Sequence, residues 1–190
     1  MIRMQIADVQ GEITRVLLTR EQIQEKIEEA AARVDHDYKD KNPLLIAVLK
    51  GAINTMTEFS QALHINAEMD FMSLSSYGSG TTSSGNVQVR QDLSTDVTGR
   101  NVLIVEDIID SGVTLAWLRD LLIARGAASV EIFALLSKPA RHKVKIDVKY
   151  GGFEIPDEFV VGFGLDYAEK YRNLDCIAVL DPKVYGGDKD

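Results

Sequence analysis

The sequence has little of what stabilises a secreted or membrane-spanning protein. It contains one cysteine among 190 residues, so no disulfide can form within the chain. Its longest unbroken apolar runs, such as Leu44–Leu49, fall far below the ~20 residues that a membrane-spanning helix needs. Residues Met1–Arg20 mix charges and lack the apolar core of a secretory signal. We therefore expect a cytoplasmic protein with no membrane partner.

Basic residues are in the minority. The chain has 21 Lys and Arg against 29 Asp and Glu, which gives a formal net charge of −8. Non-specific nucleic-acid binding needs a basic surface, so we expect no nucleic acid as a partner. An anionic ligand must then be held by backbone amides, a metal ion or a few well-placed cations. The lone Cys176 lies in the run Cys-Ile-Ala-Val-Leu, which favours a core thiol over a catalytic one.

The apolar pattern predicts an α/β fold with a mainly parallel central sheet flanked by helices. Continuous apolar runs of strand length are typical of parallel strands buried on both faces, and strands that alternate with helices favour such a sheet. Thr19-Arg20-Glu21-Gln22 is a capping box and predicts a helix start. We expect strands at Leu44–Leu49, Ala67–Ser75, Asn101–Val105 and Val130–Leu136, and helices at Ile53–Leu63 and from about Ser111 to Arg125, with Gly126 as the stop.

A chain of 190 residues is long enough for one well-packed domain and short for two, so we expect a single domain of residues 1–190. We expect a core at about 10–138 and a small hood mainly from about 139–182, with short strands near Lys145–Val148, Phe159–Gly162 and Cys176–Leu180. Ser, Thr and Gly dominate Ser75–Gly85, which has no apolar periodicity. A loop of this length is either a surface hairpin or a functional lid, and the residues leave both open.

The most informative segment runs from Asn101 to Leu115. An apolar strand leads to two adjacent carboxylates, Glu106 and Asp107, and Asp110 follows before the turn into a helix. In open α/β sheets, ligands bind beyond the carboxyl ends of the strands. The unpaired amides and positive dipole end of the next helix bind phosphate. Carboxylates suit hydroxyl groups or a hydrated cation, so the segment predicts a sugar-phosphate site.

An alternative is that Asp110 and Ser111 only cap the helix, as such residues often do. Capping does not explain three carboxylates close together, which are electrostatically costly without a ligand, metal or proton. Gly112 and Thr114 complete the unit, because glycine lets the backbone approach a ligand and the threonine hydroxyl adds a donor. We therefore favour a ligand site.

This segment resembles the phosphoribosyl-pyrophosphate motif of the type I phosphoribosyltransferases, and Val105–Gly112 resembles its form in their hypoxanthine–guanine branch. The resemblance extends over most of the chain, from Leu44 to about Leu180. Further similar segments are Leu49-Lys50-Gly51 (the pyrophosphate loop), Ser75–Gly78 (the start of the lid), and Lys138, Phe159–Asp166 and Arg172 (the purine-binding hood). The hood segments narrow the resemblance to members of the family that act on 6-oxopurines.

The resemblance implies Mg²⁺-dependent transfer of a 5-phosphoribosyl group from phosphoribosyl pyrophosphate to N9 of hypoxanthine or guanine. Glu106 and Asp107 would bind the ribose hydroxyls, directly or through Mg²⁺, and Asp110 would take the proton from purine N7 as general base. The other residues implied in binding phosphoribosyl pyrophosphate are Ser111, Gly112, Val113 and Thr114 at the 5′-phosphate, and Lys50, Gly51 and Arg172 at the pyrophosphate.

On the purine side, the resemblance implies that Lys138 donates to O6, Phe159 stacks on the ring and the Val160 backbone faces its edge. Asp166 would hold a second Mg²⁺ beside the purine, and Ser76 and Tyr77 would belong to the lid. Taken singly, a lysine after a strand is usually a solvated surface residue and a phenylalanine is usually core. An Asp followed six residues later by an Arg is usually a weak surface ion pair.

Two positions depart from common forms of the family. Ala52 follows Lys50-Gly51 where Gly or Ser is frequent, and Val113 stands where some members carry Lys. The first affects the expected pyrophosphate contacts, and the second removes a possible cation from the phosphate turn.

Three alternative functions stay open. The first is transfer to xanthine or another base, because xanthine also presents a 6-oxo group to Lys138. The second is a non-catalytic regulator that senses phosphoribosyl pyrophosphate, although the acidic composition lacks the basic face that nucleic-acid binding needs. The third is a nucleotide-binding domain without transfer activity. The resemblance also implies a homo-oligomer, either a dimer or a tetramer.

Overall fold

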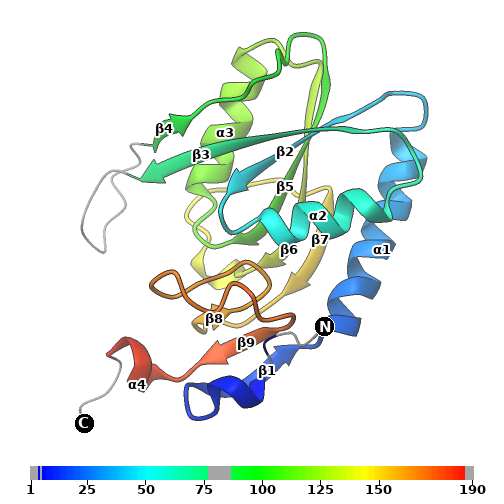
Figure 1. Ribbon diagram of the computed structural model, residues 1–190. Helices are drawn as coiled ribbons and strands as arrows, with labels where there is room; N and C mark the ends of the chain where they lie inside the picture. The colour runs from blue at the N-terminus through cyan, green and yellow to red at the C-terminus, as the bar shows by residue number, and fades with distance from the viewer. Residues whose placement is uncertain (1–3, 5, 77–86, 187–190) are drawn as a thin grey trace.

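The fold is a six-stranded sheet with a smaller sheet beside it (Figure 1). The structure, a computed structural model, describes residues 4, 6–76 and 87–186. In the larger sheet, β3, β2, β5, β6 and β7 run parallel, and β4 pairs antiparallel with β3 at one edge. This confirms the predicted mainly parallel sheet. The strands in spatial order are β4 (Val87–Gln91), β3 (Glu68–Ser76), β2 (Leu44–Leu49), β5 (Asn101–Ile109), β6 (Ser129–Ser137) and β7 (Tyr150–Glu154).

The central strands are buried on both faces, and their alternate residues enter two separate cores. Along β2, Leu45 and Ala47 pack in one cluster, whereas Leu44 and Ile46 pack in the other. Residues 102–105 of β5 and 132–135 of β6 alternate in the same way. Successive side chains of a strand point to opposite faces. A strand buried on both faces must therefore be apolar throughout, which is why these runs were visible in the sequence.

Helices cover both faces of this sheet (Figure 1). The core on one face includes buried residues of α1 (Arg20–Asp37) and α2 (Ile53–Ala62), and the core on the other includes those of α3 (Val113–Ala124). The predicted capping box begins α1. The Gln22 N–H donates to the Thr19 hydroxyl at 3.3 Å, and the Thr19 N–H donates to the Gln22 side chain at 2.9 Å.

Two glycines with left-handed backbones bound α3. Gly112, at the N-cap, has φ +77°, and Gly126, just past the end, has φ +87°. Glycine adopts this conformation without steric cost, whereas other residues rarely do. The Ala127 N–H donates back to the Leu122 carbonyl at 3.2 Å, which closes the last turn. Gly126 is thus the helix stop that the sequence predicted.

The smaller sheet consists of β1 (Ile13–Leu18), β9 (Ile177–Leu180) and β8 (Val160–Val161), paired antiparallel. Figure 1 shows it beyond the ends toward which β5 and β6 run. The chain also contains the short helices η1 (Ile6–Val9), η2 (Pro139–Arg141) and α4 (Pro182–Tyr185). We still propose one domain with a hood. The smaller sheet includes β1, which precedes the residues 139–182 expected in the hood. By contrast, β7 lies within 139–182 but belongs to the larger sheet.

The strand expected at Lys145–Val148 was wrong. These residues form no strand, and β7 begins at Tyr150. Ile146 and Val148 instead pack against the core on the α3 side from an irregular segment. Their two-residue spacing therefore reflects packing and not strand pairing.

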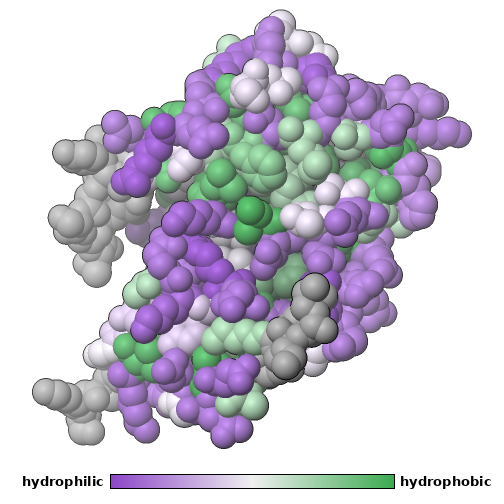
Figure 2. Space-filling model, viewed as in Figure 1, coloured by the Kyte–Doolittle hydropathy of each residue, from purple (hydrophilic) through white to green (hydrophobic). Residues whose placement is uncertain are grey.

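Hydrophilic residues cover most of the face shown in Figure 2, with smaller apolar areas between them. In the part of the chain that the structure describes, exposed large apolar side chains include Val16, Ile53, Met69, Ile123 and Phe159. They are spread over different elements, and only Phe159 belongs to the set predicted to bind a ligand.

Candidate active site

The turn between β5 and α3 forms the first part of the site. Ser111 and Gly112 lead into α3, and the Val113 N–H donates to the Ser111 hydroxyl at 3.4 Å. The amides of a helix N-terminus and nearby hydroxyls suit a phosphate group. A cavity of about 130 Å³ opens at this turn and is lined by Glu106, Ile108, Ile109, Asp110, Ser111, Gly112, Thr114 and Leu115. The structure therefore brings Ser111, Gly112 and Thr114 together around one space, whereas Val113, also predicted at the phosphate, is not among its lining residues.

The acidic pair lies within β5 and not after it. The expected strand end at Val105 was too early, because backbone pairing with β6 continues to Ile109. Val105 and Ile108 pack against the same core although they are three residues apart, so the regular alternation is interrupted at Glu106 and Asp107. Burial raises the pKa of both carboxyls, and the charge of Asp107 raises that of Glu106 further. A cation or hydroxyl donors would relieve this arrangement.

Two glycines allow three segments to meet at the Lys50-Gly51 turn. A Cβ atom built on Gly51 would lie 2.0 Å from Oδ2 of Asp107, and one built on Gly164 would lie 2.1 Å from the Gly51 carbonyl oxygen. Only glycine permits such approaches. Gly164 also has φ +101°. The turn after β2, where the Leu49–Lys50 peptide is cis, thus packs between Asp107 on β5 and the loop after β8.

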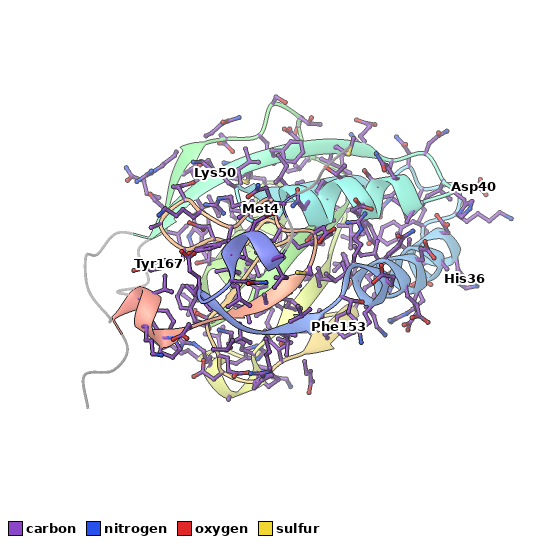
Figure 3. The ribbon with its side chains drawn as sticks, turned by 60° about the horizontal axis from the view of Figure 1, so that its bottom comes forward. Met4, His36, Asp40, Lys50, Phe153 and Tyr167 are labelled. Atoms are coloured by element: carbon purple, nitrogen blue, oxygen red, sulfur yellow. The ribbon has the colours of Figure 1, made fainter. Side chains whose placement is uncertain are left out.

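Charged side chains from the same loop gather around Arg172. Its guanidinium lies 2.8 Å from an Asp166 carboxylate oxygen and 3.3 Å from Glu169. Glu169 also accepts from the Lys50 ammonium at 3.1 Å. The structure thereby joins Lys50 and Arg172, both predicted at the pyrophosphate, through a carboxylate that no motif indicated. Figure 3 shows Lys50 and Tyr167 at one end of the molecule, away from α1 residue His36.

A second cavity lies beside the first. Its volume is about 170 Å³, and its lining residues are Ile108, Asp110, Lys138, Phe159, Val160 and Leu165. Three of these were predicted to contact the purine, and Asp110 was predicted as the general base that takes its proton. Ile108 and Leu165 were not predicted. The backbone of Lys138 is held next to that of Asp110, because the Lys138 N–H donates to the Ile109 carbonyl at 2.9 Å. Asp110 and Ile108 line both cavities.

Lys138 is not the solvated surface lysine that its sequence position alone would suggest. It is only 8% exposed, and burial lowers the pKa of its ammonium group. The negative charges of Asp110 and Asp157 oppose this effect. A buried lysine facing a small cavity is suited to donate a hydrogen bond to an oxygen atom placed there.

Phe159 is 38% exposed and is backed by aromatic rings from the C-terminal part of the chain. Its ring is stacked on that of Tyr185 in α4, with centroids 4.9 Å apart, and meets Tyr167 edge-on at 5.7 Å. The Phe159 carbonyl accepts the Leu180 N–H at 2.9 Å. Neither tyrosine was predicted, since no local pattern links these positions.

Two sets of predicted residues have a different placement. Asp166 does not line the second cavity and instead forms the ion pair with Arg172. Of the two lid residues, Ser76 pairs with Val87 at the end of β3, and Tyr77 lies outside the described residues. Arg141 was not predicted at all, although its Nε lies 2.5 Å from Oδ1 of Asp110.

Across residues 6–76 and 87–186, no group of three or more His, Cys, Asp or Glu could hold a metal ion by itself. Mg²⁺ commonly uses one or two carboxylates together with substrate oxygens, so the pair Glu106 and Asp107 fits such an ion when a substrate shares it. In the same part of the chain, no helix is long and apolar enough to cross a membrane.

Comparison with known proteins gives consistent matches. Residues 17–168 match the phosphoribosyl transferase domain. The chain is 51% identical to a hypoxanthine-guanine phosphoribosyltransferase of Bacillus subtilis, over 92% of this chain and 97% of that protein. It is 50% identical to the bifunctional protein TilS/HprT of Listeria monocytogenes, of whose length it spans 27%. A solved hypoxanthine phosphoribosyltransferase of Staphylococcus aureus superimposes with a TM-score of 0.90 at 44% identity, covering 93% of this chain and 96% of that one.

Proposed function

Because the chain belongs to the phosphoribosyltransferase family, in its hypoxanthine–guanine branch, we propose that it transfers the 5-phosphoribosyl group of phosphoribosyl pyrophosphate to N9 of hypoxanthine or guanine. The products are IMP or GMP and pyrophosphate, as in purine salvage. One observation carries the proposal. Two adjoining cavities share Asp110, and one suits a phosphate while the other has a buried lysine and an aromatic ring for a 6-oxopurine.

On the sugar-phosphate side, Ser111, Gly112, Val113 and Thr114 bind the 5′-phosphate through amides and hydroxyls at the start of α3. Glu106 and Asp107 bind the ribose hydroxyls, directly or through Mg²⁺. Their raised pKa values support this role, because both carboxylates are stabilised by a cation or by hydroxyl donors. Asp166 is the third carboxylate that we assign to Mg²⁺. When bound, Mg²⁺ supplies charge screening for the leaving pyrophosphate.

At the pyrophosphate, Lys50, Gly51 and Arg172 bind the leaving group. The ion pairs among Lys50, Glu169 and Arg172 support this assignment, since they hold two cations close to Gly51 and Asp107. As the bond at ribose C1 breaks, the sugar becomes oxocarbenium-like, and the carboxylates of β5 stabilise positive charge there.

At the purine, Lys138 donates to O6, Phe159 stacks on the ring and the Val160 backbone faces its edge. N9 attacks C1 while Asp110 takes the proton from N7, so that the product purine carries no additional charge. Lys138 selects 6-oxopurines over adenine, because the 6-amino group of adenine is also a donor. Asp110 lines both cavities, which supports its assignment as the base for this step.

The test is a spectrophotometric assay with phosphoribosyl pyrophosphate, Mg²⁺ and, in turn, hypoxanthine, guanine, xanthine, adenine and uracil. We expect conversion of hypoxanthine or guanine, abolished by EDTA, and little reaction of adenine and uracil. Preferred use of xanthine would revise the substrate. Binding of phosphoribosyl pyrophosphate without turnover of any base would contradict the proposal and favour a regulator.

We further propose a cytoplasmic enzyme that assembles as a homodimer or homotetramer. The single cysteine, which leaves the chain without an internal disulfide, fits the first part. Size-exclusion chromatography with light scattering tests the second, and a monomer at assay concentrations would contradict it.

A further inference from the structure

Arg141 occupies a position that no motif indicated. It is the last residue of η2, the short helix after β6, and its guanidinium contacts two carboxylates. Nε lies 2.5 Å from Oδ1 of Asp110, and Nη1 donates to Oδ1 of Asp157 at 3.2 Å. Asp110 follows β5 and Asp157 follows β7, so Arg141 connects the segments that follow two strands of the larger sheet.

Asp157 also faces the lysine of the second cavity. The Lys138 ammonium lies 3.9 Å from Oδ1 of Asp157, the same oxygen that Arg141 contacts. The four side chains therefore form a series of alternating charge, in the order Asp110, Arg141, Asp157 and Lys138. The first and last of the series, Asp110 and Lys138, line the cavity of about 170 Å³, whereas Arg141 and Asp157 are not among its lining residues.

We propose that Arg141 is a positioning residue that orients the Asp110 carboxylate toward the purine, with Asp157 as the anchor that Arg141 shares with Lys138. This inference rests on the proposed function. In that function, Lys138 and Asp110 contact O6 and N7 of the same ring, so their relative placement must match the purine. The guanidinium fixes that placement because its N–H donors diverge in a rigid plane and reach two carboxylates at once.

The exposure of these groups separates positioning from a structural role. The side chains of Arg141, Asp110 and Asp157 are each about half exposed, at 49%, 49% and 48%. Ion pairs this exposed contribute little to folding stability. By contrast, a displacement of about 1 Å in a reacting group costs on the order of 10²-fold in rate. Loss of Arg141 should therefore appear in the transfer step and leave the stability of the fold unchanged.

The experiment compares Arg141→Gln, Arg141→Lys and Asp157→Asn with the unmodified chain in single-turnover formation of IMP, so that product release does not mask the transfer step. Arg141→Gln should slow the step by roughly 10- to 100-fold. Arg141→Lys should recover part of the rate, because an ammonium group can still pair with Asp110. Asp157→Asn should cause a smaller loss, since Arg141 keeps its contact with Asp110.

Three controls make the result specific. Binding of phosphoribosyl pyrophosphate, measured by calorimetry, and Tm should both stay at the values of the unmodified chain. Arg119→Gln is the matched control, because Arg119 is a partly exposed arginine of α3 that pairs with its neighbour Asp120. It should react at the unmodified rate.

Other outcomes would overturn the inference. A normal rate for Arg141→Gln in an active enzyme would remove Arg141 from the reaction, and a faster rate would show that it restrains Asp110. A fall in Tm that accounts for the lost activity, with no recovery in Arg141→Lys, would indicate a structural role. An unmodified chain that forms no nucleotide from any base would overturn the proposed function, and with it this inference.

Discussion

Replacing Gly51 by alanine would test the contact that holds the site together. The new Cβ would lie 2.0 Å from Oδ2 and 3.0 Å from Cγ of Asp107. Ordinary contact begins near 3.4 Å, so the two groups must separate by about 1.4 Å (3.4 − 2.0). Asp107 is only 8% exposed, and its Oδ1 accepts the Ile108 N–H at 2.7 Å. The carboxylate therefore cannot move away freely, and either it or the Lys50-Gly51 turn must be displaced.

A displacement of this size should lower kcat/KM by on the order of 10²-fold. Overpacking should also reduce the free energy of unfolding by about 1–3 kcal/mol. The assays are steady-state kinetics with hypoxanthine and urea denaturation. Gly151→Ala is the matched control, because a Cβ there meets no atom within 4 Å. It should leave both quantities close to those of the unmodified chain.

The clash can be assigned to Asp107 by a double-mutant cycle, since contacting residues do not contribute additively. In an Asp107→Ala background, the alanine at position 51 no longer meets Oδ2 or Cγ, and its cost in unfolding free energy should largely disappear. An unchanged cost in that background would refute the steric explanation. So would normal kcat/KM for Gly51→Ala.

Three further changes test other parts of the site and fold. Lys138→Met keeps the buried stem but removes the charged donor, so kcat/KM for hypoxanthine should fall roughly 10- to 150-fold, as expected for about 1.5–3 kcal/mol; unchanged kinetics would exclude an O6 contact. Tyr185→Ala removes the ring stacked on Phe159, and KM for hypoxanthine should rise roughly 2- to 10-fold from the loss of about 0.5–1.5 kcal/mol; an unchanged KM would mean that Phe159 needs no backing. Asp70 is buried, which alone would raise its pKa, but three backbone N–H groups donate to it and its pKa is lowered. Its stabilisation is therefore present above its unfolded pKa of about 3.9 and is lost as the pH falls through the lower folded value. Asp70→Asn should lower the unfolding free energy at pH 7 by about 1–3 kcal/mol and weaken its decline in acid, as urea titrations at pH 7 and pH 3 would measure; an equally steep decline would contradict this.

Local signals made the central sheet and the phosphate turn predictable. β2 and residues 102–105 of β5 are apolar throughout because both faces of the sheet are covered. The turn into α3 carries its own requirement for glycine at position 112, where φ is +77°. Each of these features depends on neighbours in the chain. Sequence patterns record such short-range requirements directly.

Features that depend on distant residues were not predictable. β1 is stabilised by pairing with β9, from the other end of the chain, and nothing local distinguishes it from a loop. Lys50 and Glu169 are 119 positions apart, so their ion pair leaves no pattern in the sequence. The same holds for Arg141 at Asp110 and for Tyr185 behind Phe159. Family resemblance indicated which residues we assign to the substrate, but not which residues contact them.

The central claim is that Asp110 accepts a proton while the phosphoribosyl group is transferred to a 6-oxopurine. Its most direct test is single-turnover formation of IMP by the unmodified chain and by Asp110→Asn, which keeps the shape of the side chain but removes the base. We expect rapid formation by the unmodified chain, a loss of ~10²–10⁴-fold in the variant, and unchanged binding of phosphoribosyl pyrophosphate. Equal rates for the two proteins would contradict the account.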